Sequence, residues 1–160
     1  MATVAEKDRP NIVMMPPLAA LTALILCLIL HFIYKPWWLP GFPSTVGIIA
    51  GLALVAAGFA IAHAATNHFH EAGTNVDPTK PALVVVTTGP YRFTRNPMYV
   101  GLLLVHFGVG LAASLDWTLV ITPLLWAFLN WGVVVREEAY MTEKFGDDYR
   151  ELLGHTRRWI

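Results

Sequence analysis

Charged residues are scarce in this chain of 160 residues. Asp, Glu, Lys and Arg make up 14% of the sequence and hydrophobic residues 56%, whereas soluble domains usually carry about 25% charged residues. The formal net charge is zero, so no basic excess indicates a nucleic-acid partner. Cys27 is the only cysteine, which excludes a disulfide framework or a cysteine-based metal site within one chain. These deficits favour a single small membrane domain, residues 1–160.

The charge-free intervals indicate where the chain crosses a membrane. A helix needs about 20 mainly apolar residues to span the bilayer core, and four uncharged intervals are long enough. The first is longer than the core of a signal peptide and no small-residue cleavage site follows it, so we expect a retained helix. We predict an all-α integral membrane protein with about four transmembrane helices, at about 17–34, 44–65, 97–115 and 117–135, followed by a tail at 136–160.

The basic residues are distributed unevenly about these helices. With four spans, both termini and the loop between the second and third helices lie on one side, which carries every lysine and arginine except Lys35. Positive residues favour the cytoplasmic side. We therefore predict cytoplasmic N- and C-termini, in a plasma membrane or, for a bacterial protein, the inner membrane. Trp37, Trp38 and Trp117 would then lie in the aromatic belt on the far side.

The stretch TTGPYRFTRNPMYVG precedes and opens the third helix. Asn96 suits an N-cap and Pro97 a first helical position, so a helix should begin here. Helix N-termini attract anions, and Arg92 and Arg95 add positive charge. A Gly-Pro turn would fold Tyr91 back over the helix start. The alternative is an ordinary capped helix with arginines that extend to the membrane interface.

Two adjacent carboxylates, Glu137 and Glu138, follow the fourth span directly. They would oppose the dipole of a helix that ended there. One explanation is that the helix continues to Gly146. The better explanation is that the carboxylates meet a cationic or hydroxyl-bearing ligand, because charge near membrane depth indicates a functional site by default. The tail FGDDYRELLGHTRRWI is amphipathic. It either lies on the membrane or folds back as a lid, with Arg157 and Arg158 facing lipid phosphates or an anionic substrate.

Histidines and glycines mark other features of the helices. His63 and His70 share a helix face, but no third ligand has convincing spacing, so we predict no metal site. Histidines inside spans either form buried hydrogen bonds or line a cavity. Small residues at helical spacing indicate close packing of the second and third helices: they are Gly47, Gly51 and Gly58, and Gly101, Gly108 and Ala112.

The chain contains TTGPYRFTRNPMYVG, an uncharged hairpin, and then REEAYMTEKFGDDYRELLGHTRRW. This order resembles the isoprenylcysteine carboxyl methyltransferase and phospholipid N-methyltransferase superfamily, whose motifs are RHPxYxG, a Glu-Glu pair, FGxxYxxY and a terminal RW. Its members are integral-membrane enzymes that use S-adenosylmethionine. The resemblance covers about Ala72 to Trp159, and AGTNVDPTKPALVVVTTG is similar to small bacterial members. Asn96 replaces the usual His and Leu152 the second tail Tyr, which leaves the methyl acceptor open.

The resemblance implies a cytoplasmic cofactor site formed by the loop between the second and third helices and the C-terminal tail. The helix start would suit the methionyl carboxylate, and the glutamates its ammonium and the ribose hydroxyls. A lipophilic small molecule, lipidated substrate or membrane lipid would offer a carboxylate, thiol or amine, and we expect Glu138 and Arg157 to act on it as catalytic residues. By position, the cofactor-binding residues would be Tyr91, Arg92, Arg95, Asn96, Pro97, Tyr99, Gly101, Glu137 and Glu138.

Two other functions remain open at this point. An NADPH-dependent reductase is one, since sterol reductases resemble this superfamily in their C-terminal half, although they have many more spans. A non-catalytic membrane module is the other. Cofactor binding separates the three: S-adenosylhomocysteine for a methyltransferase, NADPH for a reductase, and neither for a module. The sequence indicates neither the acceptor nor the oligomeric state.

Overall fold

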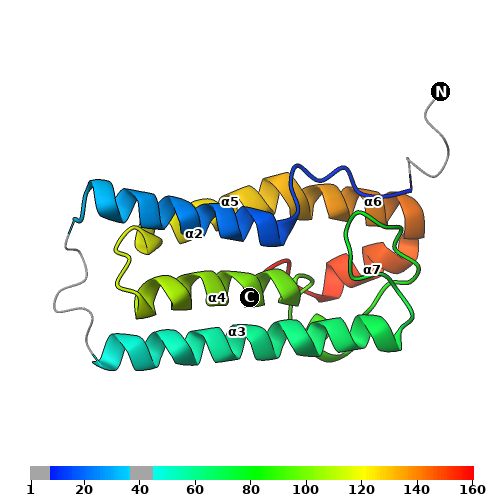
Figure 1. Cartoon of the computed structure of the whole chain (residues 1–160). Helices are drawn as coiled ribbons and strands as arrows, with labels where there is room; N and C mark the ends of the chain where they lie inside the picture. The colour runs from blue at the N-terminus through cyan, green and yellow to red at the C-terminus, as the bar shows by residue number, and fades with distance from the viewer. Residues whose placement is uncertain (1–7, 37–44) are drawn as a thin grey trace.

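The computed structural model describes residues 8–36 and 45–160 and has the form of an elongated bundle of antiparallel helices (Figure 1). The described residues form no β-sheet, only an isolated bridge between Thr94 and Arg157. At one end of the bundle, α7 folds back along α6 (Figure 1). The elements are α2 (Pro16–Ile33), α3 (Thr45–Glu71), η1 (Gly89–Arg92), α4 (Pro97–Ala112), α5 (Thr118–Leu129), the π-helical turn η2 (Asn130–Val134), α6 (Val135–Phe145) and α7 (Asp147–His155).

Three of these helices are long and apolar enough to cross a membrane: α2, α3 and the continuous helix Thr118–Phe145. The fourth, α4, is shorter: its 16 residues give a length of about 24 Å, against roughly 30 Å for a bilayer core. The predicted all-α membrane fold is therefore confirmed. The chain has the architecture of an integral membrane protein.

Three helices end at residues other than those predicted: α3, α4 and the last long helix, which continues to Phe145 rather than ending at 135. α2, at 16–33, nearly coincides with the predicted 17–34, but α3 continues to Glu71 rather than ending at 65. α4 begins at Pro97 as predicted and ends at Ala112 rather than 115. Ser114 has a φ of 57°, a left-handed conformation that typically follows the end of a helix. The chain therefore turns earlier than its charge pattern indicates.

The aromatic residues expected at the far membrane face are only partly described. Trp37 and Trp38, and the predicted start of the second span at residue 44, lie outside the described residues. Trp117 lies at the junction between α4 and α5, where its indole Nε1 donates to the carbonyl of Tyr34 (2.8 Å). This contact joins the end of α2 to the start of α5.

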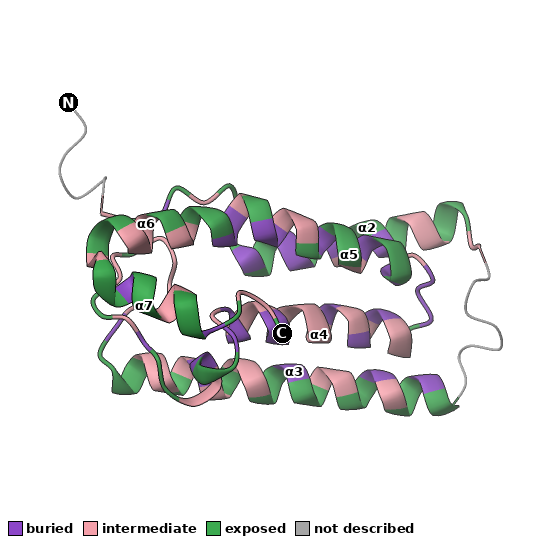
Figure 2. Cartoon of the chain, turned by 180° about the vertical axis from the view of Figure 1, so that it is seen from behind, coloured by how far each residue is buried: buried purple, intermediate pink, exposed green. Residues whose placement is uncertain are grey.

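The surface of the bundle is apolar and its interior is tightly filled. Cys27 and Leu129 are fully buried where α2 packs against α5. Leu52 and Phe59 on α3 and Leu124 on α5 are each more than half exposed. Figure 2 shows exposed residues along the outer sides of the helices. Exposed apolar faces on long helices suit a hydrocarbon surrounding. A soluble bundle would carry polar residues there.

Small residues bring α3 and α4 into backbone contact, as the glycine spacing predicted. A Cβ on Gly58 would lie 2.6 Å from the carbonyl oxygen of Gly101, and a Cβ on Gly51 would lie equally close to that of Gly108. A side chain larger than hydrogen therefore cannot fit at these crossings unless the helices move apart. The contact fixes where the start of α4 lies beside α3.

The last long helix runs past the charge-free segment without a break. It passes Glu137 and Glu138 and ends before Gly146, whose φ is 58°. This confirms the interpretation that the helix continues to Gly146, so the two carboxylates do not stand at a helix C-terminus. Because the uncharged segment ends at Val135, both glutamates lie on the extension beyond the span.

Residues 8–13, here called the N-terminal strap, run along α6 and η2 before α2 begins (Figure 1). The N–H of Val13 donates to the carbonyl of Gly132 (3.0 Å). Nearer the N-terminus, Lys144 Nζ lies 2.6 Å and 2.9 Å from the carboxylate oxygens of Asp8. The Asp8 side chain is 46% exposed, so this ion pair contributes little to stability. Its effect is to position the strap beside α6.

Substituting Gly58 with Ala should destabilise the fold by about 1–3 kcal/mol, the usual cost of overpacking a tight contact. The expected result is a lower midpoint of thermal unfolding in detergent. Gly154→Ala in α7 is the matched control, because no atom lies within 4 Å of a Cβ there. Alanine is also the better helix former. Equal midpoints for the two variants would contradict the tight α3–α4 contact.

Candidate functional site

A pocket opens at the end of the bundle that holds α6 and α7. The empty space inside it and at its open mouth amounts to about 890 Å³. The walls come from the loop at 74–86, the start of α4, α6 and α7. Apolar and aromatic side chains predominate, including Phe69, Val86, Tyr91, Met98, Met141 and Leu152.

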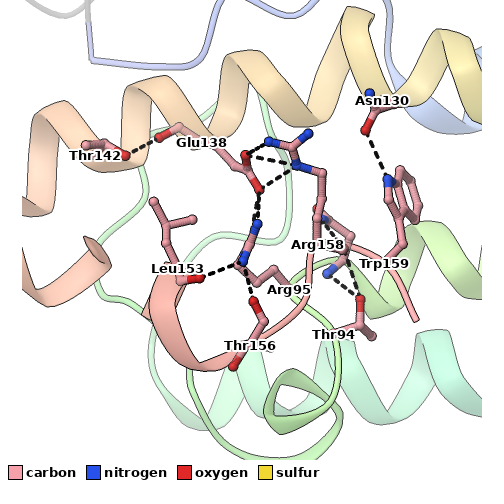
Figure 3. A network of polar contacts seen from close by, with 10 residues as sticks. Thr94, Arg95, Asn130, Glu138, Thr142, Leu153, Thr156, Arg158 and Trp159 are labelled. Atoms are coloured by element: carbon pink, nitrogen blue, oxygen red, sulfur yellow. Dashed lines mark hydrogen bonds and ion pairs between the residues drawn. The ribbon is translucent and has the colours of Figure 1, made fainter. Parts of the chain in front are cut away.

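One carboxylate in the pocket wall is held by two guanidinium groups (Figure 3). Arg95 donates to Oε1 of Glu138 from Nε (3.1 Å) and from its second terminal nitrogen (2.9 Å). Arg158 donates to Oε2 from its terminal nitrogen (2.6 Å) and lies 3.1 Å from both oxygens through Nε. The side chains of Arg95 and Glu138 are only 10% and 12% exposed. We call this arrangement the clamp.

Arg95 also binds the backbone of the C-terminal segment. Its other terminal nitrogen donates to the carbonyls of Leu153 (3.3 Å) and Thr156 (Figure 3). The guanidinium group therefore already faces one carboxylate and two carbonyl oxygens. It is engaged in joining α4 to the tail.

Asn96 stands at the N-cap position, but its side chain does not cap the helix. The amide Nδ2 instead donates to the carbonyl of Arg158 (2.9 Å), which also accepts from the hydroxyl of Thr94 (3.1 Å). The N–H of Arg95 donates to the carbonyl of Arg157 (2.9 Å). The expected start of α4 at Pro97 is correct, whereas the expected capping bond is wrong. Because the tail lies beside this buried residue, a carbonyl of the tail accepts the hydrogen bond from its amide.

The C-terminal tail is also fixed to the middle of the long helix. The indole Nε1 of Trp159 donates to Oδ1 of Asn130 (3.0 Å), as Figure 3 shows. The indole also lies against Trp126, with ring centroids 6.0 Å apart. Segments 94–96, 130–138 and 153–159 therefore meet in one polar network at the pocket.

Glu137 is the second carboxylate of the pair and lines the pocket. The hydroxyl of Tyr99 donates to its Oε1 (2.7 Å). The two cationic side chains nearby, Arg95 and Arg158, both pair with Glu138. Among the described residues, no cationic side chain pairs with Glu137. Burial raises the pKa of Glu137 to about 7, with the charge of Glu138 adding to the rise and the Tyr99 hydrogen bond opposing it. This carboxylate is available to a cationic ligand.

Aromatic side chains form another part of the pocket wall. Tyr91 is 5% exposed and its ring stacks on that of Phe69, with centroids 5.0 Å apart. Tyr149 of α7 is buried and also lines the pocket. Burial raises the pKa of both phenols above the ordinary value, so they stay neutral. Stacked aromatic faces and neutral hydroxyls suit a nucleoside or a cationic group.

The structure brings most of the predicted site residues to the pocket. Arg92 and Arg157 are exposed and do not line it, and Gly101 lies against the backbone of Gly58 in the α3–α4 contact. The predicted residues that line the pocket are Tyr91, Arg95, Asn96, Pro97, Tyr99, Glu137 and Glu138.

Sequence reasoning did not anticipate several residues of the site. Tyr140 is one: its hydroxyl accepts from the N–H of Ala82 (3.1 Å) and donates to Oδ1 of Asp8 (2.8 Å), which ties the loop and the strap to α6. Its position three residues after Glu137 places both on one helix face, a signal that was present. Phe69 and Asn130 had no comparable signal, because their partners are distant in the chain.

The histidines of α3 lie outside the pocket lining. His63 contacts Asn67 (3.2 Å), and His68 lies 3.2 Å from Glu71. Across residues 8–36 and 45–160, no group of three or more His, Cys, Asp or Glu side chains is placed to hold a metal ion.

The sequence profile of a family described as phospholipid methyltransferase matches residues 46–148. The chain belongs to the phospholipid methyltransferase family. The match runs from the start of α3 into α7, so the family region includes Arg95, Glu137 and Glu138. Arg158 and Trp159, which complete the clamp and the tail contact, lie beyond it.

Two relatives resemble parts of the chain. Protein-S-isoprenylcysteine O-methyltransferase of Schizosaccharomyces pombe is 35% identical over 69 residues, which are 42% of this chain and 29% of the yeast protein. The alignment thus spans less than a third of that relative. An uncharacterized protein of Haemophilus influenzae is 40% identical over 65 residues, 39% of this chain and 100% of that protein. No solved structure matches the chain.

Glu138→Gln should lower the free energy of unfolding by about 3 kcal/mol. The substitution removes the carboxylate that neutralises the charges of two partly buried arginine side chains. Denaturant unfolding in detergent measures the change. Glu137→Gln is the matched control. It keeps an acceptor for Tyr99 and removes a carboxylate whose charge burial disfavours, so its effect should be under about 1 kcal/mol. Equal losses in the two variants would contradict the clamp.

Proposed function

We propose that this protein transfers the methyl group of S-adenosylmethionine to a lipophilic or membrane-associated acceptor. Membership of the phospholipid methyltransferase family supports methyl transfer, as does the activity for which the yeast relative is named. The observation that carries the proposal is Glu137, a partly buried carboxylate that pairs with no cation among the described residues and lines an aromatic-walled pocket beside the clamp. A cofactor with an ammonium, a nucleoside and a sulfonium fits that set of groups.

The pocket residues divide the binding among them. Glu137 would hold the ammonium group of the cofactor, and the stacked pair of Tyr91 and Phe69 would take a flat ring or the sulfonium charge. Arg95 and Glu138, whose polar atoms already bind one another, would act by fixing the wall rather than by direct contact. When bound, S-adenosylmethionine supplies an electrophilic methyl group.

The acceptor would be oriented by the protein rather than activated by a strong base. Displacement at a methyl carbon gains most from alignment and exclusion of water. Ala82, Val84 and Met141 give the pocket apolar lining, which suits a lipophilic acceptor carrying a carboxylate, thiol or amine. The exposed Arg157 lies beside the tail contact and would attract an anionic part of that acceptor. These assignments depend on S-adenosylmethionine as the methyl donor.

The orientation proposed for the membrane places the pocket at the cytoplasmic face. Nearly all lysines and arginines lie on the segments around the pocket, and such residues favour that side. Both termini would then be cytoplasmic, in a plasma or bacterial inner membrane. The cofactor would enter from water and the acceptor from the bilayer.

Calorimetric titration of the detergent-purified protein with S-adenosylhomocysteine tests this function. We expect binding at pH 8, weakened at least about tenfold in Glu137→Gln, because a charge-assisted contact is lost. Glu143→Gln, exposed on the same helix, is the control and should bind like the wild type. Affinity of the wild type should fall as pH drops below about 7, where Glu137 becomes protonated and can no longer pair with an ammonium. Glu137→Gln should lack this pH dependence.

NADPH, titrated in parallel, decides between the alternatives. Binding of NADPH without S-adenosylhomocysteine would replace the methyltransferase with a reductase. Failure of both to bind to folded protein would leave a non-catalytic membrane module.

A further inference from the structure

Asn130 is the one side-chain amide within the uncharged segment 117–135. It is 6% exposed, and a buried amide at this depth is costly unless it is hydrogen-bonded. Neither the family motifs nor the pocket lining includes it. Its partner is the indole Nε1 of Trp159, at 3.0 Å. The amide therefore binds a residue near the end of the chain.

The backbone at Asn130 is unusual as well. Here α5 changes into the π-helical turn η2, and the N–H of Val135 donates to the carbonyl of Asn130, five residues earlier. Such turns are rare inside α-helices and frequent at functional sites. The turn lies directly before α6, which carries Glu137 and Glu138 to the pocket.

The N-terminal strap and the C-terminal tail are both attached to this one turn. The N-terminal strap bonds through Val13 to the carbonyl of Gly132 (3.0 Å), and the C-terminal tail bonds through Trp159 to Asn130. The residue before Trp159 is Arg158, which donates to both oxygens of Glu138. A shift of Trp159 would therefore move the guanidinium group that holds the pocket wall.

We propose that Asn130 is a positioning residue for the cofactor pocket. Its hydrogen bond holds Trp159 in place, and Trp159 in turn holds Arg158 against Glu138. Asn130 does not line the pocket, so its influence on a ligand passes through the tail. The inference rests on the proposed function only for the identity of the ligand. The attachment of the tail is measurable without any ligand.

Two substitutions remove the same hydrogen bond from opposite sides. Asn130→Leu removes the acceptor, and Trp159→Phe removes the donor and keeps an aromatic ring. Each should weaken S-adenosylhomocysteine binding about fivefold, as expected when one neutral hydrogen bond is lost, and the double variant should bind no more weakly than either single variant. Asn67→Leu on α3 and Trp131→Phe, at an exposed position within the turn, are the matched controls, and both should bind like the wild type.

If Asn130 acts through Arg158, its effect on ligand affinity depends on the presence of Arg158. A purely structural role would not show this dependence. In an Arg158→Ala background, Asn130→Leu should cause no further loss of affinity, although its effect on the thermal midpoint should persist. An equal loss of affinity with and without Arg158 would overturn the proposal. So would unchanged binding in Asn130→Leu.

Hydrogen–deuterium exchange of residues 156–160 and of the Arg95 N–H, which donates to Arg157, tests the attachment independently. Both should exchange faster in Asn130→Leu and Trp159→Phe than in the two controls. Unchanged exchange would refute the attachment. If the wild type does not bind S-adenosylhomocysteine, the proposed function fails, and the exchange measurement alone then decides the role of Asn130.

Discussion

The site depends on one carboxylate shared by two guanidinium groups. Glu138 lies on the extension of the long helix, Arg95 just before α4, and Arg158 near the end of the chain (Figure 3). Removing such a partner is costly, because the remaining charges stay half-buried without compensation. The same three residues bring the start of α4, the helix that carries Glu137, and the tail to a common wall. The pocket is a consequence of that junction.

The membrane-like part of the chain sets the position of this junction. Close backbone contact at Gly58 and Gly101 fixes α4 against α3 and thereby fixes the height of Arg95. The long helix carries its two glutamates past the charge-free segment, so that both reach the pocket. The apolar outer faces and the polar end are thus two results of one pattern, in which charged residues are kept out of the membrane-spanning segments.

Local patterns in the sequence predicted the helices, the start of α4 at Pro97, the glycine contact and the group of residues around the pocket. They did not predict which polar groups pair. Asn96 was expected to cap its own helix, yet its amide binds the carbonyl of Arg158, because a tail more than sixty residues away lies beside it. The expected anion site at Arg95 already holds Glu138. Asn130 and the N-terminal strap escaped notice for the same reason: their partners are distant in sequence, and residue type alone does not identify them.

The most direct test of this account is an experimental structure of the protein with S-adenosylhomocysteine bound. The division of labour between the two glutamates predicts that the ammonium group of the ligand contacts Glu137, while Glu138 keeps its bonds to Arg95 and Arg158. A ligand whose carboxylate displaces Glu138 from Arg95 would contradict it, since the clamp would then be a binding group rather than the support of the pocket.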